Sequence, residues 1–285
     1  MEGVITKIIS NRFWVLCKQG EIDCMARGSI KNNSIVVGDK VEVDEISNVI
    51  VKALPRKNYL LRPPIANLDK LIIVISKQPE PDFYVLDKLL LFCFLKKIIP
   101  VIAVNKTDLG SEIVEYVKKV YSSFVKCVFV SAKSGLGTND LKNEIEGNVC
   151  AFAGQSAVGK SSLLNLLVGN ESEKVGELSS KIMRGKNTTR HVCLHSACNG
   201  ILADTPGFSF LSEDFLPCSY KELKDYYPDM VTLSQKCKFS SCQHDKEHDC
   251  AVKFAIAHGE YDDQRYKRYL QIKNNLFKRW KNKYE

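Results

Sequence analysis

The sequence contains no apolar stretch long enough to cross a lipid bilayer. Its longest apolar runs, such as Leu71–Ile75 and Leu89–Leu95, fall far short of the roughly 20 residues that a membrane-spanning helix needs. Residues Met1–Ser10 also lack the charged flank and apolar core of a secretory signal. These absences argue against a membrane or secreted protein, and we expect a cytoplasmic protein with no membrane partner.

The pattern of the 11 cysteines lacks the features of a disulfide framework. Eight of them are scattered singly along the chain, and several, including Cys93, Cys127 and Cys150, lie inside apolar runs. A free thiol in such surroundings behaves as a small hydrophobic group. This usage favours a reducing compartment. Internal repeats and low-complexity tracts are also absent.

The composition is that of a globular protein with a substantial core. The chain has 285 residues, enough for two or three domains, with 45% hydrophobic and 26% charged residues. Its net charge of +8 is unevenly distributed, because the segment Tyr261–Glu285 contains eight basic and three acidic residues. This basic tail is either a surface that faces a polyanion or a solvated helix face.

Residues 1–66 consist of short apolar segments separated by turn residues such as Gly20 and Gly38. Five short strands without a helical period predict a small β-barrel of the oligonucleotide-binding (OB) type. A β-domain used only for packing is the alternative. The predicted strands are Val4–Ile9, Phe13–Cys17, Ile22–Met25, Val41–Val43 and Val49–Ala53, and the proline-flanked segment Pro55–Pro64 is typical of a linker.

From Leu68 onwards, apolar runs alternate with segments of helical spacing. Continuous apolar runs rich in β-branched residues are typical of buried parallel strands. Such alternation predicts a doubly wound α/β domain with a parallel sheet. The expected order is strand Leu71–Ile75, helix Tyr84–Lys97, strand Pro100–Val104, helix Ile113–Phe124, strand Cys127–Val130 and strand Val149–Ala153.

A phosphate-binding loop follows the last of these strands. The stretch GQSAVGKS fits the pattern G-x-x-x-x-G-K-S between the apolar strand VCAFA and the periodic segment SSLLNLL. Backbone N–H groups of such a loop face phosphates, Lys160 reaches the β- and γ-phosphates, and the Ser161 hydroxyl binds Mg²⁺. The predicted nucleotide-binding residues here are Gly154, Gln155, Ser156, Ala157, Val158, Gly159, Lys160, Ser161 and Ser162.

Two further motifs follow in the order of a nucleotide switch. In the tetrapeptide DTPG, Asp204 at a strand end helps to hold Mg²⁺, and the Gly207 N–H meets the γ-phosphate. The polar stretch RGKNTTRH lies upstream, and its Thr189 hydroxyl is expected to complete the metal shell. We therefore expect Lys160, Thr189, Asp204 and Gly207 to form the catalytic set, with Ser161 and Thr189 as the magnesium ligands.

Two motifs upstream of the phosphate-binding loop are assigned to base selection. Asn105-Lys106-Thr107-Asp108 ends one predicted strand, and Ser131-Ala132-Lys133 ends the next. The Asp108 carboxylate can accept hydrogen bonds from the ring N–H and the exocyclic amine of guanine, whereas adenine offers the wrong pattern. Asn105 supports Asp108, the Lys106 stem lies over the ring, and the Ala132 N–H faces the guanine oxygen. The motifs therefore favour GTP over ATP.

The guanine-binding half thus precedes the phosphate-binding half, the reverse of the usual order in a GTPase. This order predicts a circularly permuted GTPase domain in which the chain is cut after the DTPG segment. A permutation is tolerated when the original ends lie close together at the surface. The γ-phosphate-sensing loop then leads directly into the C-terminal region.

That region contains a dense group of metal-ligating side chains. Cys237, Cys242, His244 and Cys250 lie within 14 residues, and three thiolates with one imidazole fit a tetrahedral structural zinc site. The short Cys242-x-His244 spacing favours His244 over His248 as the fourth ligand, although His248 remains possible. Reduced cysteines in a loop are the alternative.

In the order of these parts the chain resembles the ribosome small-subunit-dependent GTPase A (RsgA) family of bacteria. The resemblance runs from the barrel through RKNYLLRP and the permuted motifs to Cys-x₄-Cys-x-His-x₅-Cys followed by AV. It implies an OB-fold RNA-binding domain at 1–66, a permuted GTPase domain at 67–211 and a helical zinc-binding domain at 212–285. It also implies GTP hydrolysis stimulated by the small (30S) ribosomal subunit in late maturation, with 16S rRNA binding, release on hydrolysis and one zinc ion per chain.

Two positions depart from the usual motifs of that family, and a third differs from many other GTPases. Ala157 replaces a glycine inside the phosphate-binding loop, a mild change. Asn187 stands where the switch loop usually carries a histidine, and Phe208 follows DTPG where many GTPases place a water-orienting glutamine. We therefore expect the ribosome to supply the water-orienting group, as partner proteins do for other GTPases.

A binding module is the alternative class, in the form of a GTP-gated RNA clamp with little turnover. The tail aromatics Tyr266, Tyr269, Phe277 and Trp280 would serve either function, or they pack an amphipathic helix onto the zinc region. A permuted GTPase that acts on something other than ribosomes is disfavoured by the combination of barrel and zinc motif. We expect a monomer.

Overall fold

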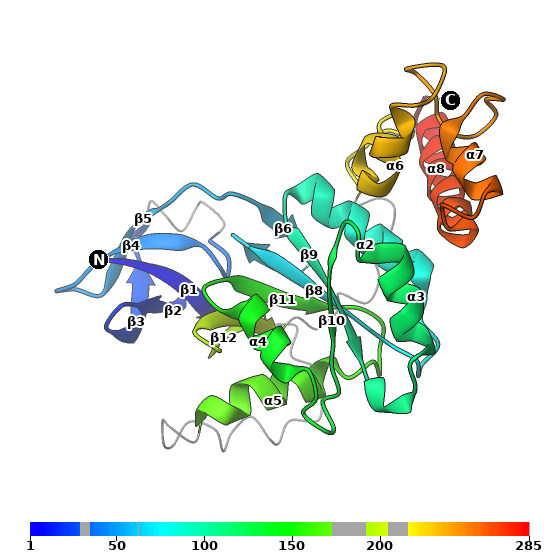
Figure 1. Ribbon diagram of the computed structural model, residues 1–285. Coiled ribbons are helices and arrows are strands. Elements are labelled where there is room, and N and C mark those ends of the chain that lie inside the picture. The colour runs from blue at the N-terminus through cyan, green and yellow to red at the C-terminus, as the bar shows by residue number, and fades with distance from the viewer. Residues whose placement is uncertain (29–34, 62, 173–191, 205–215, 285) are drawn as a thin grey trace.

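The computed structural model describes residues 1–28, 35–61, 63–172, 192–204 and 216–284 of the chain. Three parts follow one another in sequence and in space (Figure 1). The N-terminal barrel lies at one end of the molecule, the sheet is central, and the C-terminal helices lie beyond α2 and α3 at the other end. Among the described residues, no helix combines the length and apolar character needed to cross a membrane.

The N-terminal part is a closed barrel with the strand order β1-β2-β3-β5-β4. Antiparallel hairpins join β1 to β2 and β2 to β3, whereas β3 and β5 pair in parallel and β4 closes onto β1. Alternate side chains point inwards, so Ile5, Val15 and Val41 are fully buried. The predicted barrel is confirmed. Its strands are β1 (Glu2–Ile9), β2 (Arg12–Cys17), β3 (Gly20–Ala26), β4 (Lys40–Asp44) and β5 (Val49–Ala53).

The segment predicted as a linker contains structure of its own. β6 (Tyr59–Leu61) pairs antiparallel with β7 (Pro64–Ala66). Pro64 is compatible with this pairing because it occupies the first position of its strand. Arg56 also binds the buried carboxylate of Asp39 at 2.6 and 2.7 Å, which ties the segment to the barrel. The linker prediction is therefore wrong for the paired residues.

The central sheet has the strand order β10-β9-β8-β11-β13-β12. All neighbouring strands pair in parallel except β12, which runs antiparallel to β13 at one edge. The strand before the phosphate-binding loop, β11, therefore lies in the middle of the sheet between β8 and β13. The strands are β8 (Lys70–Ser76), β9 (Ile99–Asn105), β10 (Lys126–Phe129), β11 (Val149–Ala153), β12 (Cys193–Ala197) and β13 (Gly200–Asp204).

The edge strand β12 was not predicted. Its sequence, CLHSA, is half polar and too short to show a clear period. A two-residue turn, Cys198-Asn199, joins it to β13, and both residues have positive φ angles of 54° and 55°. Positive φ at both central residues is the geometry of a type I′ hairpin turn. Cys-Asn is a weak signal for this turn, so only the backbone revealed the hairpin.

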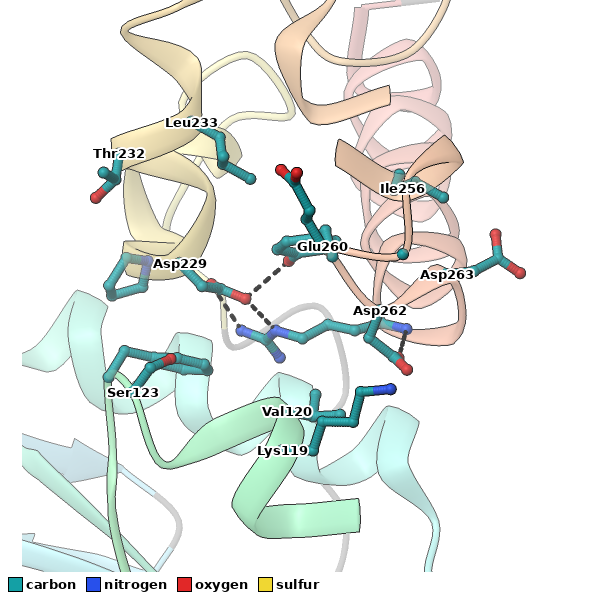
Figure 2. Close-up of a pocket in the computed structure, with 15 residues that line it drawn as sticks. Lys119, Val120, Ser123, Asp229, Thr232, Leu233, Ile256, Glu260, Asp262 and Asp263 are labelled. Carbon is teal, nitrogen blue, oxygen red and sulfur yellow. Dashed lines mark hydrogen bonds and ion pairs between the residues drawn. The ribbon is translucent and has the colours of Figure 1, made fainter. Parts of the chain in front are cut away.

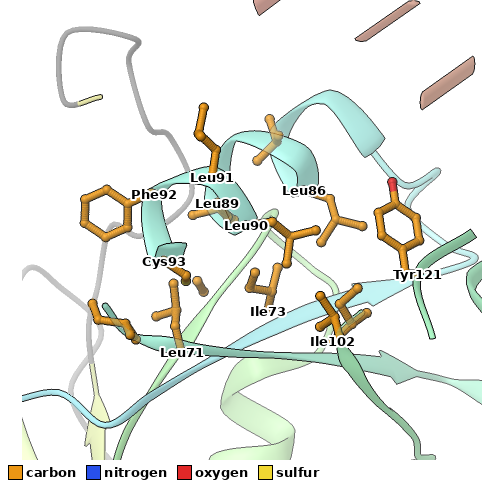
Figure 3. Packing of buried hydrophobic residues seen from close by; sticks show 14 of the residues in the cluster. Leu71, Ile73, Leu86, Leu89, Leu90, Leu91, Phe92, Cys93, Ile102 and Tyr121 are labelled. Atoms are coloured by element: carbon orange, nitrogen blue, oxygen red, sulfur yellow. The ribbon is translucent and has the colours of Figure 1, made fainter. Parts of the chain in front are cut away.

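Helices cover both faces of the sheet, as a doubly wound fold requires. On one face, Leu86 and Leu89 of α2 pack against Leu71 and Ile73 of β8 (Figure 3). On the other face, α4 and α5 pack apolar side chains such as Leu163 against the sheet. The predicted α/β architecture is confirmed. The helices of this part are α2 (Phe83–Lys96), η1 (Thr107–Leu109), α3 (Glu112–Tyr121), α4 (Thr138–Ile145) and α5 (Lys160–Ser172).

The C-terminal region is helical, with η4 (Leu223–Tyr226), α6 (Pro228–Ser234), α7 (Ala251–Ala257) and the long α8 (Asp263–Tyr284). α8 reaches back to the α/β part, where its Arg265 and Arg268 bind Asp87 of α2. Arg265 also binds Asp229 of α6 at 2.5 Å beside a cavity of about 620 Å³ between α3 and the C-terminal helices (Figure 2).

These contacts divide the basic tail. Arg265 is only 2% exposed, and Arg268 is also largely buried, so these two residues form a junction within the protein rather than a surface for a polyanion. The aromatic residues divide in the same way. Tyr269 is fully buried, whereas Phe277 and Trp280 are 42% and 45% exposed and lie against Tyr220. The amphipathic-packing alternative is therefore correct for the first half of the helix.

Candidate nucleotide site and metal cluster

The phosphate-binding loop connects β11 to α5, and α5 begins at Lys160. Gly154 and Gly159 have positive φ angles of 122° and 97°. A Cβ atom at Gly154 would lie 2.1 Å from the Val74 carbonyl oxygen, and one at Gly159 would lie 2.3 Å from Asn105 Nδ2. Both positions therefore require glycine, because the loop passes close to the ends of β8 and β9. This loop conformation allows the backbone N–H groups to come close to a bound phosphate chain.

Ala157 adopts the left-handed conformation with φ of 63°. A residue with a side chain pays about 1–2 kcal/mol for this conformation, which glycine adopts freely. The alanine at this position therefore keeps the loop geometry at a modest cost in stability, which explains why the departure from the family motif is mild.

The Lys160 ammonium group lies over the loop that precedes it. Its Nζ donates hydrogen bonds to the carbonyl oxygens of Gly154 (2.7 Å) and Gln155 (2.5 Å). Burial lowers its pKa below the usual value. The group is thus held at the start of α5, where the helix dipole also favours a negatively charged ligand.

Asn105 joins three sequence motifs in one place. Its side chain is buried, Nδ2 donates to the Val158 carbonyl of the phosphate-binding loop (2.9 Å), and Oδ1 accepts from the Ala132 N–H (3.1 Å). Lys106 reinforces the contact, because its Nζ donates to the carbonyl oxygens of Ala157 (2.8 Å) and Gln78 (2.7 Å). Segments more than 50 residues apart therefore meet at the carboxyl edge of the sheet.

Asp108 is held by the next motif along the sheet. The buried Ser131 hydroxyl donates to Asp108 Oδ1 at 2.6 Å, and this hydrogen bond lowers the pKa of the exposed Asp108 carboxyl. The charged Lys133 also contributes to the lower pKa, more weakly. One carboxylate oxygen is thus fixed by Ser131, and the group remains ionised and accessible to a ligand.

The switch residues can be placed only in part. Asp204 is the last residue of β13, which is the immediate neighbour of β11. Its backbone therefore lies at the same edge of the sheet as the phosphate-binding loop. The predicted Thr189 and Gly207, together with Asn187 and Phe208, lie outside the described residues.

The side chain of Gln155 has a role that the sequence pattern did not indicate. Its Oε1 accepts from the Asp82 N–H (2.9 Å), and its Nε2 donates to the Glu80 carbonyl (3.2 Å). Asp82 in turn caps α2, because its carboxylate accepts from the Val85 N–H at 3.0 Å. The loop before α2 is thus fastened to the phosphate-binding loop. Gln155 occupies a variable position of the phosphate-binding motif, so the sequence pattern could not predict this contact.

The four predicted metal ligands lie together in the C-terminal region. One ligand atom from each of Cys237, Cys242, His244 and Cys250 lies within 4.8 Å of the others. His244 adopts a left-handed conformation with φ of 53°, which returns the chain towards the cluster after only one intervening residue. Burial lowers its pKa, which favours the neutral imidazole that a metal requires. The donor set fits zinc, and His248 is exposed and outside the cluster.

Comparison with known proteins agrees with this geometry. The sequence model of the family described as RsgA GTPase matches residues 53–213. A protein named small ribosomal subunit biogenesis GTPase RsgA from Caldanaerobacter subterraneus is 39% identical over 294 residues, covering 100% of this chain and 99% of that protein. One of the same name from Clostridium acetobutylicum is 38% identical, covering 97% of this chain and 98% of that protein.

The chain belongs to the RsgA GTPase family.

Two solved structures extend the similarity to the RsgA fold. YjeQ from Thermotoga maritima superposes with a TM-score of 0.80 at 33% identity and covers 97% of this chain and 98% of that one. YloQ, described as a circularly permuted GTPase, has a TM-score of 0.80 at 31% identity and covers 98% of this chain and 95% of that one. The predicted circular permutation is confirmed. This RsgA family member is thus a GTPase, and its family implies GTP or GDP and Mg²⁺ as ligands.

Proposed function

We propose that the protein binds GTP at the carboxyl edge of its central sheet and hydrolyses it during biogenesis of the small ribosomal subunit. The observation that carries the proposal is the placement of Asn105 between the phosphate-binding loop and Ala132. This contact joins the part that selects the base to the part that holds the phosphates. The names of the close relatives support the ribosomal role.

In this proposal the backbone of residues 154–162 receives the phosphates, and Lys160 moves its hydrogen bonds from loop carbonyls to phosphate oxygens. Ser161 and Thr189 hold Mg²⁺, with Asp204 supporting the metal and the Gly207 N–H facing the γ-phosphate. When bound, Mg²⁺ neutralises negative charge that develops on the phosphates. Lys160, Thr189, Asp204 and Gly207 then form the catalytic set.

Asp108 accepts hydrogen bonds from the ring N–H and the exocyclic amine of guanine, while Ser131 and Lys133 keep the carboxylate ionised and in place. Lys106 covers the ring with its aliphatic stem. The Ala132 N–H already donates to Asn105 Oδ1, so the guanine oxygen would share this donor with Asn105. From the sequence, the Ala132 N–H is expected to donate to the guanine oxygen alone, whereas in this proposal the N–H is shared between Asn105 and the base.

The partner in this proposal is the 30S subunit with its 16S rRNA, and the protein acts as a monomer. The barrel (1–66) and the outer half of the helical domain (212–285) contact RNA on either side of the GTPase domain (67–211). Arg265 and Arg268 are engaged with Asp87, so the tail contacts RNA through exposed residues such as Lys278 and the neighbouring Trp280. GTP hydrolysis then releases the protein from the subunit.

A zinc ion held by Cys237, Cys242, His244 and Cys250 stabilises the helical domain in this proposal. Three cysteines and one histidine are a ligand set that structural zinc sites use, with all four positions filled by the protein. Three of the four residues are buried. In such small helical regions the free energy of metal binding contributes directly to folding.

GTP turnover by the full chain, measured with and without purified small subunits, tests the proposal. We expect slow turnover alone and an acceleration on the order of 10³- to 10⁵-fold with subunits, the range that partner-supplied groups give elsewhere. Ser161→Ala should lower both rates because it weakens magnesium binding. Equal rates with and without subunits would refute the partner-completed site. Tight GTP-dependent binding to subunits without turnover would instead support the RNA-clamp alternative.

A further inference from the structure

The imidazole ring of His244 lies between two different sets of groups. On one side its Nδ1 is 3.4 Å from Cys250 Sγ and 3.7 Å from Cys237 Sγ. On the other side its Nε2 is 2.8 Å from the hydroxyl oxygen of Ser234, the last residue of α6. The ring is fully buried, so its hydrogen bonds come from these neighbours. Ser234 lies three residues before the first cysteine of the cluster and was not identified from the sequence.

The hydrogen bonds of Ser234 determine which ring nitrogen carries a proton. A serine hydroxyl has a single hydrogen to donate. The Ser234 Oγ lies 2.8 Å from the Met230 carbonyl oxygen, and a carbonyl oxygen can only accept, so the hydroxyl hydrogen is directed there. Ser234 Oγ must therefore accept from His244 Nε2–H. A neutral imidazole protonated at Nε2 has its free lone pair at Nδ1, facing the sulfur atoms.

We propose that Ser234 is a positioning residue that presets His244 as an Nδ1 ligand for the metal ion. The inference rests on the proposed zinc site, and it adds which atom binds and what selects that atom. Metal-ligating histidines commonly have their second nitrogen held by an acceptor, which fixes the tautomer and the ring orientation. Here the acceptor is a hydroxyl oriented by its own helix backbone, four residues earlier at Met230.

The backbone of His244 is held independently of its ring. The Tyr266 hydroxyl donates to the His244 carbonyl at 2.8 Å, and the Tyr269 hydroxyl donates to the preceding Gln243 carbonyl at 3.1 Å. Both tyrosines come from α8. With the main chain fixed by α8, the principal remaining freedom is rotation and tautomer exchange of the ring, and Ser234 restricts both. Loss of the Ser234 hydroxyl should therefore weaken metal binding without displacing the loop.

Zinc affinity of the full chain, measured by competition with a chromogenic chelator, tests this role. Ser234→Ala should lower the affinity by about 10- to 100-fold, the usual effect of losing a partner of a ligating histidine. Ser234→Thr, which keeps the hydroxyl, should restore most of it. Ser241→Ala is the matched control, because Ser241 lies between two of the ligands and is exposed. Equal affinities for Ser234→Ala and Ser241→Ala would refute the proposal.

A spectroscopic measurement on the unmodified protein tests the tautomer directly. In a long-range ¹H–¹⁵N correlation spectrum of histidine-labelled protein with zinc bound, His244 should show a protonated Nε2, with Nδ1 as the bound nitrogen. A proton at Nδ1, or zinc bound through Nε2, would overturn the inference even if zinc binds stoichiometrically. If no zinc binds, the zinc proposal fails, but the tautomer of the metal-free protein still tests the role of Ser234.

Discussion

Replacement of Asp87 by asparagine tests whether the buried ion pairs between α2 and α8 hold the C-terminal helices in place. The Asp87 side chain has no exposed surface, and it accepts hydrogen bonds from Arg265, Arg268 and the Tyr121 hydroxyl. Asparagine has nearly the same shape but no charge, so Arg265 would keep Asp229 as an ion-pair partner, whereas Arg268 would lose the carboxylate that it contacts. Removing one partner of a buried ion pair costs about 3–5 kcal/mol. We expect a loss of about 3 kcal/mol, because asparagine keeps one acceptor oxygen.

This loss can be measured at the helices themselves. Trp14 and Trp280 are the only two tryptophans of the chain, so a Trp14→Phe background leaves one fluorescent probe near the end of α8. Urea unfolding followed at this probe gives the free energy of unfolding of the C-terminal region. A loss of about 3 kcal/mol raises the unfolded-to-folded ratio by more than 100-fold, because each 1.4 kcal/mol corresponds to a factor of about ten.

Asp249→Asn in the same background is the matched control. Asp249 pairs with Lys238 at 2.8 Å, but both side chains are about 60% exposed. Exposed ion pairs contribute little, because water and salt screen them, so this variant should unfold like the parent. If Asp87→Asn and Asp249→Asn unfold at the same urea concentration, the junction does not hold α8 and the reasoning from burial is wrong.

Three further changes test the nucleotide and metal sites. Asp108→Asn should shift base preference from guanine towards xanthine, because an acceptor becomes a donor, and competition binding that still favours GTP over XTP would remove Asp108 from the base site. Ser131→Ala should raise the pKa of Asp108 towards its ordinary value of 3.8, because the hydrogen bond that lowers this pKa is lost. In the unmodified protein the lowered pKa means that Asp108 loses its charge only as the pH falls below 3.8. A carbon-13 titration of the Asp108 carboxyl group that shows no upward shift in the variant would contradict this prediction. Cys242→Ser should lower the zinc content and unfold the C-terminal helices while GTP affinity is kept, since the phosphate-binding loop lies in another core; freshly purified wild-type protein without zinc would contradict it.

The candidate nucleotide site could be predicted from the sequence because its chemistry lies in short contiguous segments. A phosphate-binding loop needs glycines, a lysine and a serine at fixed spacing, since the backbone itself forms the cradle. The same holds for the N-K-x-D motif at Asn105 and for the cysteine cluster at Cys237. The order of these segments was also sufficient to predict the circular permutation, because the guanine-binding motifs precede the phosphate-binding loop. The two halves can still form one site, since the carboxyl ends of parallel strands lie at the same edge of the sheet.

The choice between His244 and His248 shows where this reasoning ends. The short Cys242-x-His244 spacing favoured His244, but the sequence left His248 open, and the left-handed turn at His244 is what brings its ring among the sulfur atoms. The contact of Ser234 with that ring depends on the packing of α6 against the loop, which no local pattern describes. The two-residue turn before β13 was missed because Cys198 belongs to a residue type that rarely adopts the required positive φ angle, although Asn199 adopts it readily.

The basic tail gives the clearest division between sequence and structure. The sequence determined that Tyr261–Glu285 carries excess positive charge and aromatic residues at helical spacing. Only the tertiary structure decided that Arg265 and Arg268 are paired inside the protein with Asp87 and Asp229, while Phe277 and Trp280 remain at the surface. A residue's charge is a local property of the chain, but its burial and its counter-charge come from elements nearly 180 residues away, and these are set only when the helices pack.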